Sequence, residues 1–462
     1  MQKIIKISGI IVIVLVGLFF AGTGRVDHTP YYEADYFRNT FAKLDSLKEG
    51  IVVTNGPLQA GISKVSITPG LNNQSDDWEK GKFRHVPLSG FGARKGAPAT
   101  GINDSIHVKA LALKNMENLI VFVTADLLII PPNITDSLMV SLADEGIRRD
   151  QLFFSATHTH SAPGGWAPGY LGKQFSGMYN PNIEKWLVKQ IREAILLAID
   201  DLRPARIGSG NFDAGYLTRN RLAGELGTTN DDFDFIVVEQ VGHNKAIIGS
   251  FAAHSTTIGA RNMEISGDYP GYWARKTSEL TSGMAMFFSG SMGSQSPVGD
   301  GNEFERAGFI GEALADKTFL YSSSVAMSDS VIIAPLSLRI ELPPYNMRLT
   351  PKINLSSFLS RKLMPYPENT YLQAVRIGNL IWITIPGELS GEFALQIKNS
   401  LSAYGYDCMV TSFNGSYTGY IVPGKYFYMD KYEPKDMGWF GPYKGDYIMD
   451  LTRHLYTIII NR

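Results

Sequence analysis

The sequence predicts a mixed α/β fold, in which mixed or antiparallel β-sheets flanked by α-helices form a single domain. A continuous apolar run at residues 119–125 has the length of a buried strand. Residues 183–202 place Leu187, Ile191 and Ile195 on one helical face, as expected for an amphipathic helix packed on a sheet. Strand and helix patterns mix without strict βαβ alternation, which favours a mixed sheet, or two sheets, over an all-parallel one.

The other elements follow from the same patterns. Residues 152–156 predict a strand that leads into a loop rich in Gly and Pro. Helices are predicted at 389–401, after the Pro386-Gly387 turn, and at 448–460. Further strands are predicted at 235–239, 246–253, 284–288, 331–342 and 372–385.

The N-terminus is predicted to direct export. Lys3 and Lys6 precede an uncharged run at residues 7–21, the order that is typical of a secretory signal peptide or N-terminal membrane anchor over residues 1–25. The run is shorter than the roughly 20 residues that span a bilayer as a helix, and no Ala-x-Ala site follows it, so cleavage stays open. Either way, the bulk of the chain is expected outside the cytoplasm. Residues 26–57 are expected to form an extracytoplasmic strap, and residues 58–462 the catalytic domain.

Composition narrows the function classes. The 462 residues carry 43 basic and 44 acidic side chains, so nothing in the charge suggests a nucleic-acid partner. The single cysteine, Cys408, excludes an internal disulfide framework and a multi-thiolate metal site. Any bound metal must therefore be held by His, carboxylate or Tyr.

The run Thr157-His158-Thr159-His160-Ser161 directly follows the strand predicted at 152–156. Imidazole is both the commonest zinc ligand and the usual proton shuttle. Residues two apart on an extended chain point to opposite sides, so we expect His158 and His160 to divide these roles. The alternative is that both histidines only satisfy a turn.

Two other polar residues follow apolar strands in the same way. His254 follows residues 247–253, and Glu388 follows residues 381–387. Two histidines and one carboxylate, completed by water, form a known hydrolytic zinc set. Together with the histidine pair they predict a metal site.

Over roughly residues 58–460 the chain resembles the neutral/alkaline non-lysosomal ceramidases. The resemblance rests on several motifs in the family's order. They are Ala60-Gly61-Ile62 through Thr68-Pro69; Ser155-Ala156-Thr157-His158-Thr159-His160-Ser161-Ala162-Pro163-Gly164; Asn220-Arg221; Phe251-Ala252-Ala253-His254; Gly293-Ser294-Gln295-Ser296-Pro297; Pro386-Gly387-Glu388; and Tyr417-x-x-Tyr420, Tyr432-Glu433 and Gly441-Pro442.

The resemblance implies a zinc amidohydrolase that cleaves the N-acyl bond of ceramide, or a related N-acyl lipid, at a membrane surface. It implies one zinc ion per chain, bound by His158, His254, Glu388 and Tyr420. It implies that the reacting amide is lined by His160, Arg221 and Tyr432, and that Ser296 meets the polar head of the substrate. Zinc lowers the pKa of its bound water to about 7. His160 would then carry a proton to the leaving amine, while Arg221 and Tyr432 donate toward the oxyanion.

Ser296 has two open roles, covalent nucleophile or hydrogen-bond partner of a substrate hydroxyl. The second is favoured, because no sequence feature supplies Ser296 with a base of its own. The chain departs from the family where Ser294 and Val298 replace an Asp and an Asn around this serine, and where Phe440 replaces a Tyr. After residues 448–460 we also expect no C-terminal immunoglobulin-like domain.

Two alternatives stay open, and the sequence does not predict an oligomeric state. One is a zinc hydrolase of another N-acyl lipid or of an ester, which the changes around Ser296 motivate. The other is a non-catalytic envelope protein that binds lipid in a degraded pocket.

Overall fold

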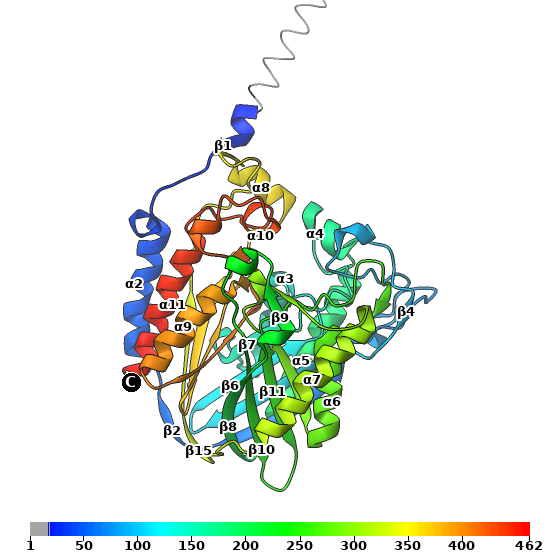
Figure 1. Cartoon of the computed structure of the whole chain (residues 1–462), viewed down its shortest axis with the longest axis vertical. Helices are drawn as coiled ribbons and strands as arrows, with labels where there is room; N and C mark the ends of the chain where they lie inside the picture. The colour runs from blue at the N-terminus through cyan, green and yellow to red at the C-terminus, as the bar shows by residue number, and fades with distance from the viewer. Residues whose placement is uncertain (1–16, 18) are drawn as a thin grey trace, which may run out of the picture.

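The computed structural model describes residues 17 and 19–462 of the chain. The predicted signal or anchor over residues 1–25 therefore lies largely outside the described residues. Within the described part, no helix combines the length and the apolar character that crossing a bilayer requires. The predicted fold class is confirmed, because helices flank two large sheets that contain both parallel and antiparallel neighbours (Figure 1).

The larger sheet has eight strands and is parallel only at its two ends, between β11 and β13 and between β6 and β7. In spatial order its strands are β13 (Met284–Ser289), β11 (Lys245–Phe251), β10 (Asp232–Gln240), β8 (Arg203–Asp213), β3 (Gln59–Ser66), β5 (His107–Asn115), β6 (Asn118–Ala125) and β7 (Leu152–Ala156).

The smaller sheet has five strands, and its one parallel pair is β18 with β20. In spatial order its strands are β2 (Thr54–Pro57), β15 (Ser330–Arg339), β17 (Tyr371–Ile377), β18 (Leu380–Thr384) and β20 (Asp407–Thr411). The two sheets pack face to face. Trp382 of β18 stacks on Phe122 of β6 with ring centroids 4.1 Å apart, at the centre of the core between the sheets.

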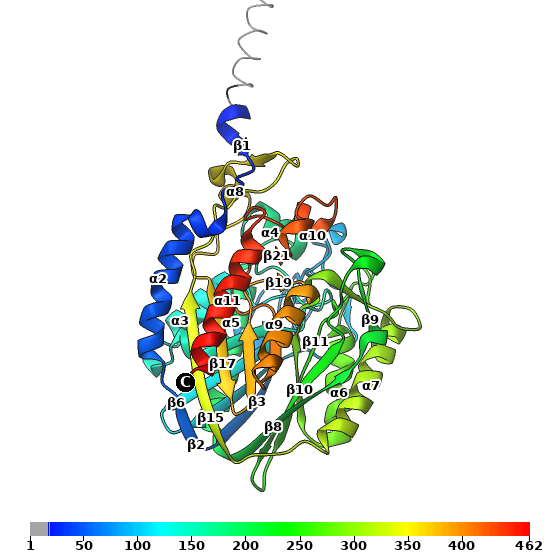
Figure 2. The same cartoon turned by 60° about the vertical axis from the view of Figure 1, so that its left-hand side comes forward.

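Helices cover the outer faces of this sandwich (Figures 1 and 2). Along β6, Phe122 faces the smaller sheet while Val121 and Val123 face the helices, because strand side chains alternate. The larger sheet is covered by α3 (Pro132–Ser141), α5 (Pro181–Asp200), α6 (Asp268–Thr281) and α7 (Glu303–Ser322). The smaller sheet is covered by α2 (Asp35–Gly50), α9 (Gly391–Ala403) and α11 (Lys444–Ile460).

The described residues also form four short strand pairs and three short α-helices. The pairs are β1 (Thr23–Arg25) with β16 (Ile353–Leu355), β4 (Gly101–Ile102) with β12 (Glu264–Ile265), β9 (Thr218–Asn220) with β14 (Gln295–Pro297), and β19 (Glu388–Leu389) with β21 (Tyr420–Ile421). The helices are α4 (Gly169–Ser176), α8 (Ser357–Leu363) and α10 (Tyr432–Lys435).

One predicted strand is wrong. Residues 372–385 form two antiparallel strands, β17 and β18, joined by a tight turn in which Gly378 has a φ of +60°. Both strands are mostly buried and mostly apolar, with Gln373 and Arg376 of β17 as the polar exceptions. The apolar run therefore concealed the turn, which only the Gly378-Asn379 dipeptide marks.

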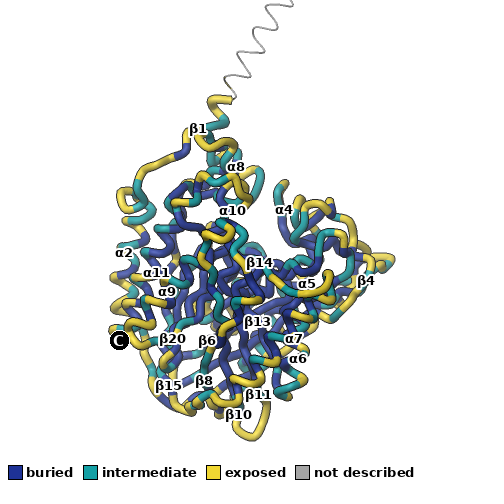
Figure 3. The backbone as a smooth tube through the Cα atoms, viewed as in Figure 1, coloured by how far each residue is buried: buried dark blue, intermediate teal, exposed yellow. Residues whose placement is uncertain are grey.

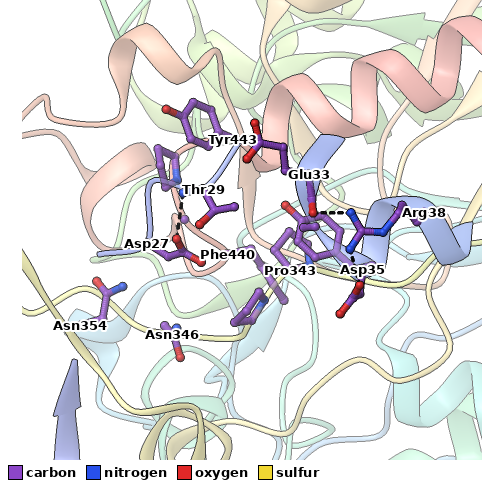
Figure 4. Close-up of a pocket in the computed structure, with 15 residues that line it drawn as sticks. Asp27, Thr29, Glu33, Asp35, Arg38, Pro343, Asn346, Asn354, Phe440 and Tyr443 are labelled. Carbon is purple, nitrogen blue, oxygen red and sulfur yellow. Dashed lines mark hydrogen bonds and ion pairs between the residues drawn. The ribbon is translucent and has the colours of Figure 1, made fainter. Parts of the chain in front are cut away.

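The segment at residues 26–57 contains helix α2, which packs beside α11. The rings of Tyr36 and Phe37 lie 5.1 Å and 6.2 Å from the ring of Tyr447 of α11. Beside this contact a cavity of about 370 Å³ separates residues 27–38 from residues 440–443 (Figure 4). In it Arg38 donates to the Glu33 carbonyl oxygen and pairs with Asp35, both partners from its own segment. The helical strap is thus docked through aromatic side chains.

The ends of three strands position the polar residues of the candidate site. β7, β11 and β18 each have a parallel neighbour, and the chain leaving each of them carries one of the polar residues singled out by sequence. Most of the backbone around these three strand ends is buried (Figure 3). A site built here is therefore held by the core of both sheets.

We expect the contact between β3 and α5 to tolerate no side chain at Gly61. A Cβ there would lie 1.9 Å from the Ala198 carbonyl oxygen and 2.9 Å from the Leu202 nitrogen. Gly61→Ala should therefore lower the free energy of unfolding by about 3 kcal/mol, at the upper end of overpacking costs. Thermal unfolding measures this. Gly50→Ala, which meets no atom within 4 Å, is the matched control and should leave Tm nearly unchanged. Equal melting temperatures would contradict the predicted packing.

Candidate active site

His158, His254 and Glu388 converge at the ends of three different strands. Each offers a ligand atom, and these atoms lie within 4.8 Å of one another. His254 Nε2 lies 3.0 Å and His158 Nε2 3.7 Å from the same carboxylate oxygen, Oε2 of Glu388. All three side chains are buried. The structure thus brings together three of the four predicted metal ligands from widely separated sequence positions.

The hydrogen bonds of the two imidazoles fix how their rings face the carboxylate. His158 Nδ1 donates to the Leu128 carbonyl oxygen at 2.8 Å, and His254 Nδ1 donates to the Met292 carbonyl oxygen at 2.8 Å. In the neutral rings both Nε2 atoms are then lone-pair acceptors. These lone pairs face a carboxylate oxygen, an arrangement that a cation between them resolves. The donor set of two imidazoles and one carboxylate fits a zinc ion, and the carbonyl contacts are the orienting kind seen behind zinc ligands.

Tyr420, the fourth predicted ligand, is also in the cluster. β19 and β21 form a short parallel pair in which Glu388 is opposite Tyr420. The Tyr420 hydroxyl lies 3.0 Å from His254 Nε2. The neighbouring Tyr417 hydroxyl donates to Glu388 Oε1 at 2.6 Å, so the carboxylate is oriented by a second phenol. Sequence reasoning gave Tyr417 no role, because a Tyr three positions before a ligand does not indicate a hydrogen bond to another strand.

Arg221 lies against this cluster and is held by a partner that sequence reasoning missed. Its Nη2 donates to the Tyr420 hydroxyl at 2.8 Å and lies 3.0 Å from His254 Nε2. Its Nε lies 2.7 Å from Glu433 Oε1, and this carboxylate is buried. Burial alone would lower the pKa of Arg221, but Tyr420, Glu433 and Glu388 outweigh it and raise the pKa. The guanidinium is therefore a fixed positive charge beside the four predicted metal ligands.

The expected alternation between His158 and His160 is wrong. β7 ends at Ala156, and His158 has a φ of +58°, so the chain is not extended at this point. The two rings instead face the same space, with their Nε2 atoms 3.4 Å apart. The role predicted for His160, proton transfer rather than metal binding, stays a prediction, and its basis in alternation no longer holds.

His160 is held in a tight enclosure. Its ring lies 4.7 Å from the ring of Phe91, and Arg94 donates to its carbonyl oxygen. Gly90 has a φ of +100°, and a Cβ there would lie 2.5 Å from His160 Cγ. Only glycine lets the ring occupy this position. The sequence offered a weak signal in Gly90-Phe91-Gly92, which nothing linked to residue 160.

Electrostatics keep the imidazoles neutral. Burial lowers the pKa of His254 to about 4, and the nearby Arg221 adds to this effect. Burial also lowers the pKa of His158, with partial compensation by Glu388. For His160, burial and the neighbouring His158, His254 and Arg221 hold the pKa well below its usual value. Neutral imidazoles at pH 7 are the form that binds a metal and accepts a proton.

The last two predicted residues lie at the edge of the site. Tyr432 is 55% exposed, and its ring stands edge-on to that of Tyr420 with centroids 5.8 Å apart. Ser296 lies on β14, and its hydroxyl accepts from Arg219 Nε at 3.4 Å. Within the described part of the chain, the Ser296 hydroxyl makes no hydrogen bond to any of the four predicted ligands, although the carbonyl oxygen of its neighbour Gln295 accepts from the His254 backbone nitrogen at 3.3 Å. Tyr432 is thus placed at the rim, and Ser296 beside Arg219.

Comparisons with known proteins support the resemblance to the neutral/alkaline ceramidases. Residues 79–300 match the sequence profile described as neutral/alkaline non-lysosomal ceramidase, N-terminal. The crystal structure of a neutral ceramidase from Pseudomonas aeruginosa is similar to this chain with a TM-score of 0.72 at 19% identity, covering 88% of this chain and 75% of that one. A second structure, a ceramidase complexed with C2, has a TM-score of 0.74 at 17% identity and the same coverage. The resemblance predicted from the motifs is confirmed, and at these identities the structural likeness shows the fold.

We expect one tightly bound zinc per chain, measured by metal analysis of the purified protein. His158→Ala and His254→Ala should each abolish both metal and activity, because each removes a ligand. Tyr417→Phe removes only the hydrogen bond to Glu388 Oε1 and should weaken zinc affinity about 10–100-fold. Tyr404→Phe, at an exposed position, is its control. Full zinc occupancy in both alanine variants would show that the ligands are assigned incorrectly.

Proposed function

Since residues 79–300 match the sequence profile of the neutral/alkaline non-lysosomal ceramidase family, we propose that this protein is a zinc-dependent amidohydrolase acting on ceramide or a related N-acyl lipid. Hydrolysis of the N-acyl bond would release a sphingoid base and a fatty acid. The observation that carries the proposal is the buried His158–His254–Glu388 group within this family's fold. A cluster of this kind is suited to metal-assisted hydrolysis of an unreactive amide.

A zinc ion held by His158, His254, Glu388 and Tyr420 would polarise the amide carbonyl and lower the pKa of a water molecule toward neutrality. The protein's part is to keep these ligands in one geometry. The Leu128 and Met292 carbonyl oxygens orient the two imidazoles, and the Tyr417 hydroxyl orients Glu388. Because these partners belong to different strand ends, the core of both sheets holds the ligands in place.

Arg221 is suited to stabilise the charge that develops on the amide oxygen. Its guanidinium is kept charged, and Glu433 and the Tyr420 hydroxyl fix its orientation. Such a preorganised donor contributes most where water is excluded. Tyr432, at the rim, is a second donor available to a substrate entering from solvent.

His160 is suited to carry the proton that the leaving amine needs. Its Nε2 faces the ligand cluster 3.4 Å from His158 Nε2, while its Nδ1 has no hydrogen-bond partner within the described part of the chain. A neutral ring in this position can accept a proton from the attacking water and pass it to the amine nitrogen. Phe91 and Gly90 limit the motion of the ring between the two steps.

A second candidate keeps the metal and changes the substrate to another N-acylated amine or an ester. The replacement of the family's Asp and Asn around Ser296 by Ser294 and Val298 favours this second candidate. Ser294, in place of the family's Asp, uses its hydroxyl to accept from the Gly391 nitrogen at 3.0 Å, and Val298 is 36% exposed. Neither contributes a carboxylate or an amide toward a substrate head group. A non-catalytic lipid-binding role is disfavoured, because all four predicted ligands are present and grouped.

Hydrolysis of N-acylsphingosine by the full chain, with and without a chelator, tests the proposed function. We expect the sphingoid base to appear, chelation to stop its release, and added zinc to restore it. The second candidate would instead show zinc-dependent release from other N-acyl amines or esters and none from N-acylsphingosine. No release from any of these substrates by a zinc-loaded protein would refute both.

His160→Ala should keep the metal and lose turnover by about 10²–10⁴-fold, the usual contribution of general acid–base catalysis. Zinc content and kcat are measured on the same preparation. His454→Ala is a control at a part-exposed histidine whose ring contacts Phe41, outside the site. Loss of metal equal to that of His158→Ala would mean that His160 is a ligand.

Ser296→Ala distinguishes the two roles of this serine. If Ser296 holds a substrate hydroxyl, the variant should lose about 1–3 kcal/mol of transition-state stabilisation for ceramide. Hydrolysis of an N-acyl amide without that hydroxyl should be affected much less. If Ser296 is the nucleophile, both substrates should fail equally. Mass spectrometry after a rapid quench decides, since an acyl adduct on Ser296 would overturn the proposed mechanism.

A further inference from the structure

We infer that one end of the molecule, centred on α8, docks on an anionic lipid surface and presents the catalytic centre to it. This end comprises β1, the loop at residues 346–352, β16 and α8, and is termed the basic platform. The inference rests on the proposed function for its lipid substrate, and it names the surface by which that substrate is approached. Four observations carry it.

The charge of the platform has one sign. Residues 342–366 contain four basic side chains, Arg348, Lys352, Arg361 and Lys362, and no acidic one. Lys352, Arg361 and Lys362 are exposed, and Arg25 of the paired strand β1 is exposed beside them. Of the nearby carboxylates, Asp430 is paired with Lys435 at 2.6 Å, and Asp27, just after β1, is exposed, so basic side chains outnumber acidic ones at this end. A patch of this kind is complementary to anionic head groups.

Apolar side chains stand among these charges. Phe358 of α8 is 68% exposed, and Lys362 Nζ lies 5.7 Å from the centre of its ring. Leu349, in the preceding loop, is also exposed. A lysine beside an exposed aromatic ring can keep its charge at the head groups while the ring enters the acyl boundary.

The N-terminal apolar run joins the molecule at this same end. The uncharged residues 7–21 lead directly into β1, where Thr23 and Arg25 pair with Leu355 and Ile353 of β16. Phe19 and Phe20 are exposed just before β1. In both views the helical residues 19–22, α8, α4 and α10 lie toward one end of the molecule (Figures 1 and 2).

An apolar pocket lies beside the platform, and one of its lining residues contacts the predicted metal ligands. It lies between α4 and residues 364–367, which directly follow α8, and its lining is almost wholly apolar. Tyr417 forms part of its wall, and the hydroxyl of this residue donates to Glu388 Oε1. An acyl chain that leaves the bilayer at the platform therefore meets an apolar surface, and one residue of this surface, Tyr417, contacts Glu388.

An environment-sensitive fluorophore tests the inference in the full chain. The label is attached at Phe358→Cys in a Cys408→Ala background, and, as the control, at Val241→Cys. Val241 is 62% exposed in the hairpin between β10 and β11, at the opposite end of the molecule (Figures 1 and 2). We expect a blue shift and quenching by lipid-borne quenchers at position 358 on phosphatidylcholine vesicles containing phosphatidylglycerol. We expect weaker signals on pure phosphatidylcholine, and none at position 241.

Charge reversal supplies the second arm. Arg361→Glu with Lys362→Glu should reduce the signal at position 358 on anionic vesicles at least about 10-fold, and should reduce hydrolysis of a vesicle-embedded N-acyl lipid. Turnover of a water-soluble short-chain N-acyl amide should not change. Lys48→Glu with Lys114→Glu, away from the platform, is the charge-matched control and should retain both properties.

The two proposals fail in different ways. If position 358 stays in water on every vesicle, or responds no more than position 241, the platform is not a lipid-docking surface, whatever the turnover. Equal signals from the two charge-reversed variants would also overturn it. If neither substrate is hydrolysed by the zinc-loaded protein, the proposed function fails, while the vesicle signal can still be measured.

Discussion

The geometry of the candidate site depends on two neutral imidazoles, those of His158 and His254, whose lone pairs face the buried carboxylate of Glu388. Burying a carboxylate is expensive unless its charge is compensated; neutral rings carry no compensating charge, and the nearby guanidinium of Arg221 is already paired with Glu433. His158 and His254 cannot turn away, because each is bound through Nδ1 to a main-chain carbonyl oxygen. Glu388 is likewise bound by Tyr417. The arrangement therefore calls for a cation, and the rest of the site is organised around that requirement.

The double-sheet core explains how such an arrangement is held. β7, β11 and β18 belong to two different sheets, yet the chain leaves each of them toward the same buried region. The Trp382–Phe122 stack ties the two sheets together behind the site. A shift of one sheet against the other would separate Glu388, on the smaller sheet's side, from the histidines on the larger sheet's side. Packing far from the metal ligands is thus part of what keeps them together.

Much of the fold was predictable because apolar runs mark strands and periodic runs mark helices. The strand at residues 152–156 was predicted with its observed bounds, and the helix predicted at 183–202 is α5. The hairpin within 372–385 was not predictable from apolar character, since both of its strands are mostly buried and mostly apolar. His158, His254 and Glu388 were found because each follows a strand. Sequence order alone could not place Ser296, which lies beside Arg219.

What sequence reasoning missed was mostly the contacts between distant segments. Glu433 holds Arg221, Tyr417 holds Glu388, and Gly90 makes space for His160. None of these pairs has a local signal, because their members are far apart in the chain. The relative direction of His158 and His160 also depended on a single backbone torsion, the positive φ at His158. A period-two pattern assumes extended chain, and the chain bends where the strand ends.

The most direct test of the account is X-ray absorption spectroscopy at the zinc edge on the purified full chain. We predict a four-coordinate zinc with about two imidazole nitrogens at roughly 2.0–2.1 Å, oxygen ligands completing the shell, and no sulfur. His254→Ala should give no such spectrum, because loss of this ligand is expected to abolish zinc binding. A metal-free protein that still hydrolyses its substrate would contradict the claim that Glu388 and the two histidines form a metal centre. So would a spectrum without imidazole ligands.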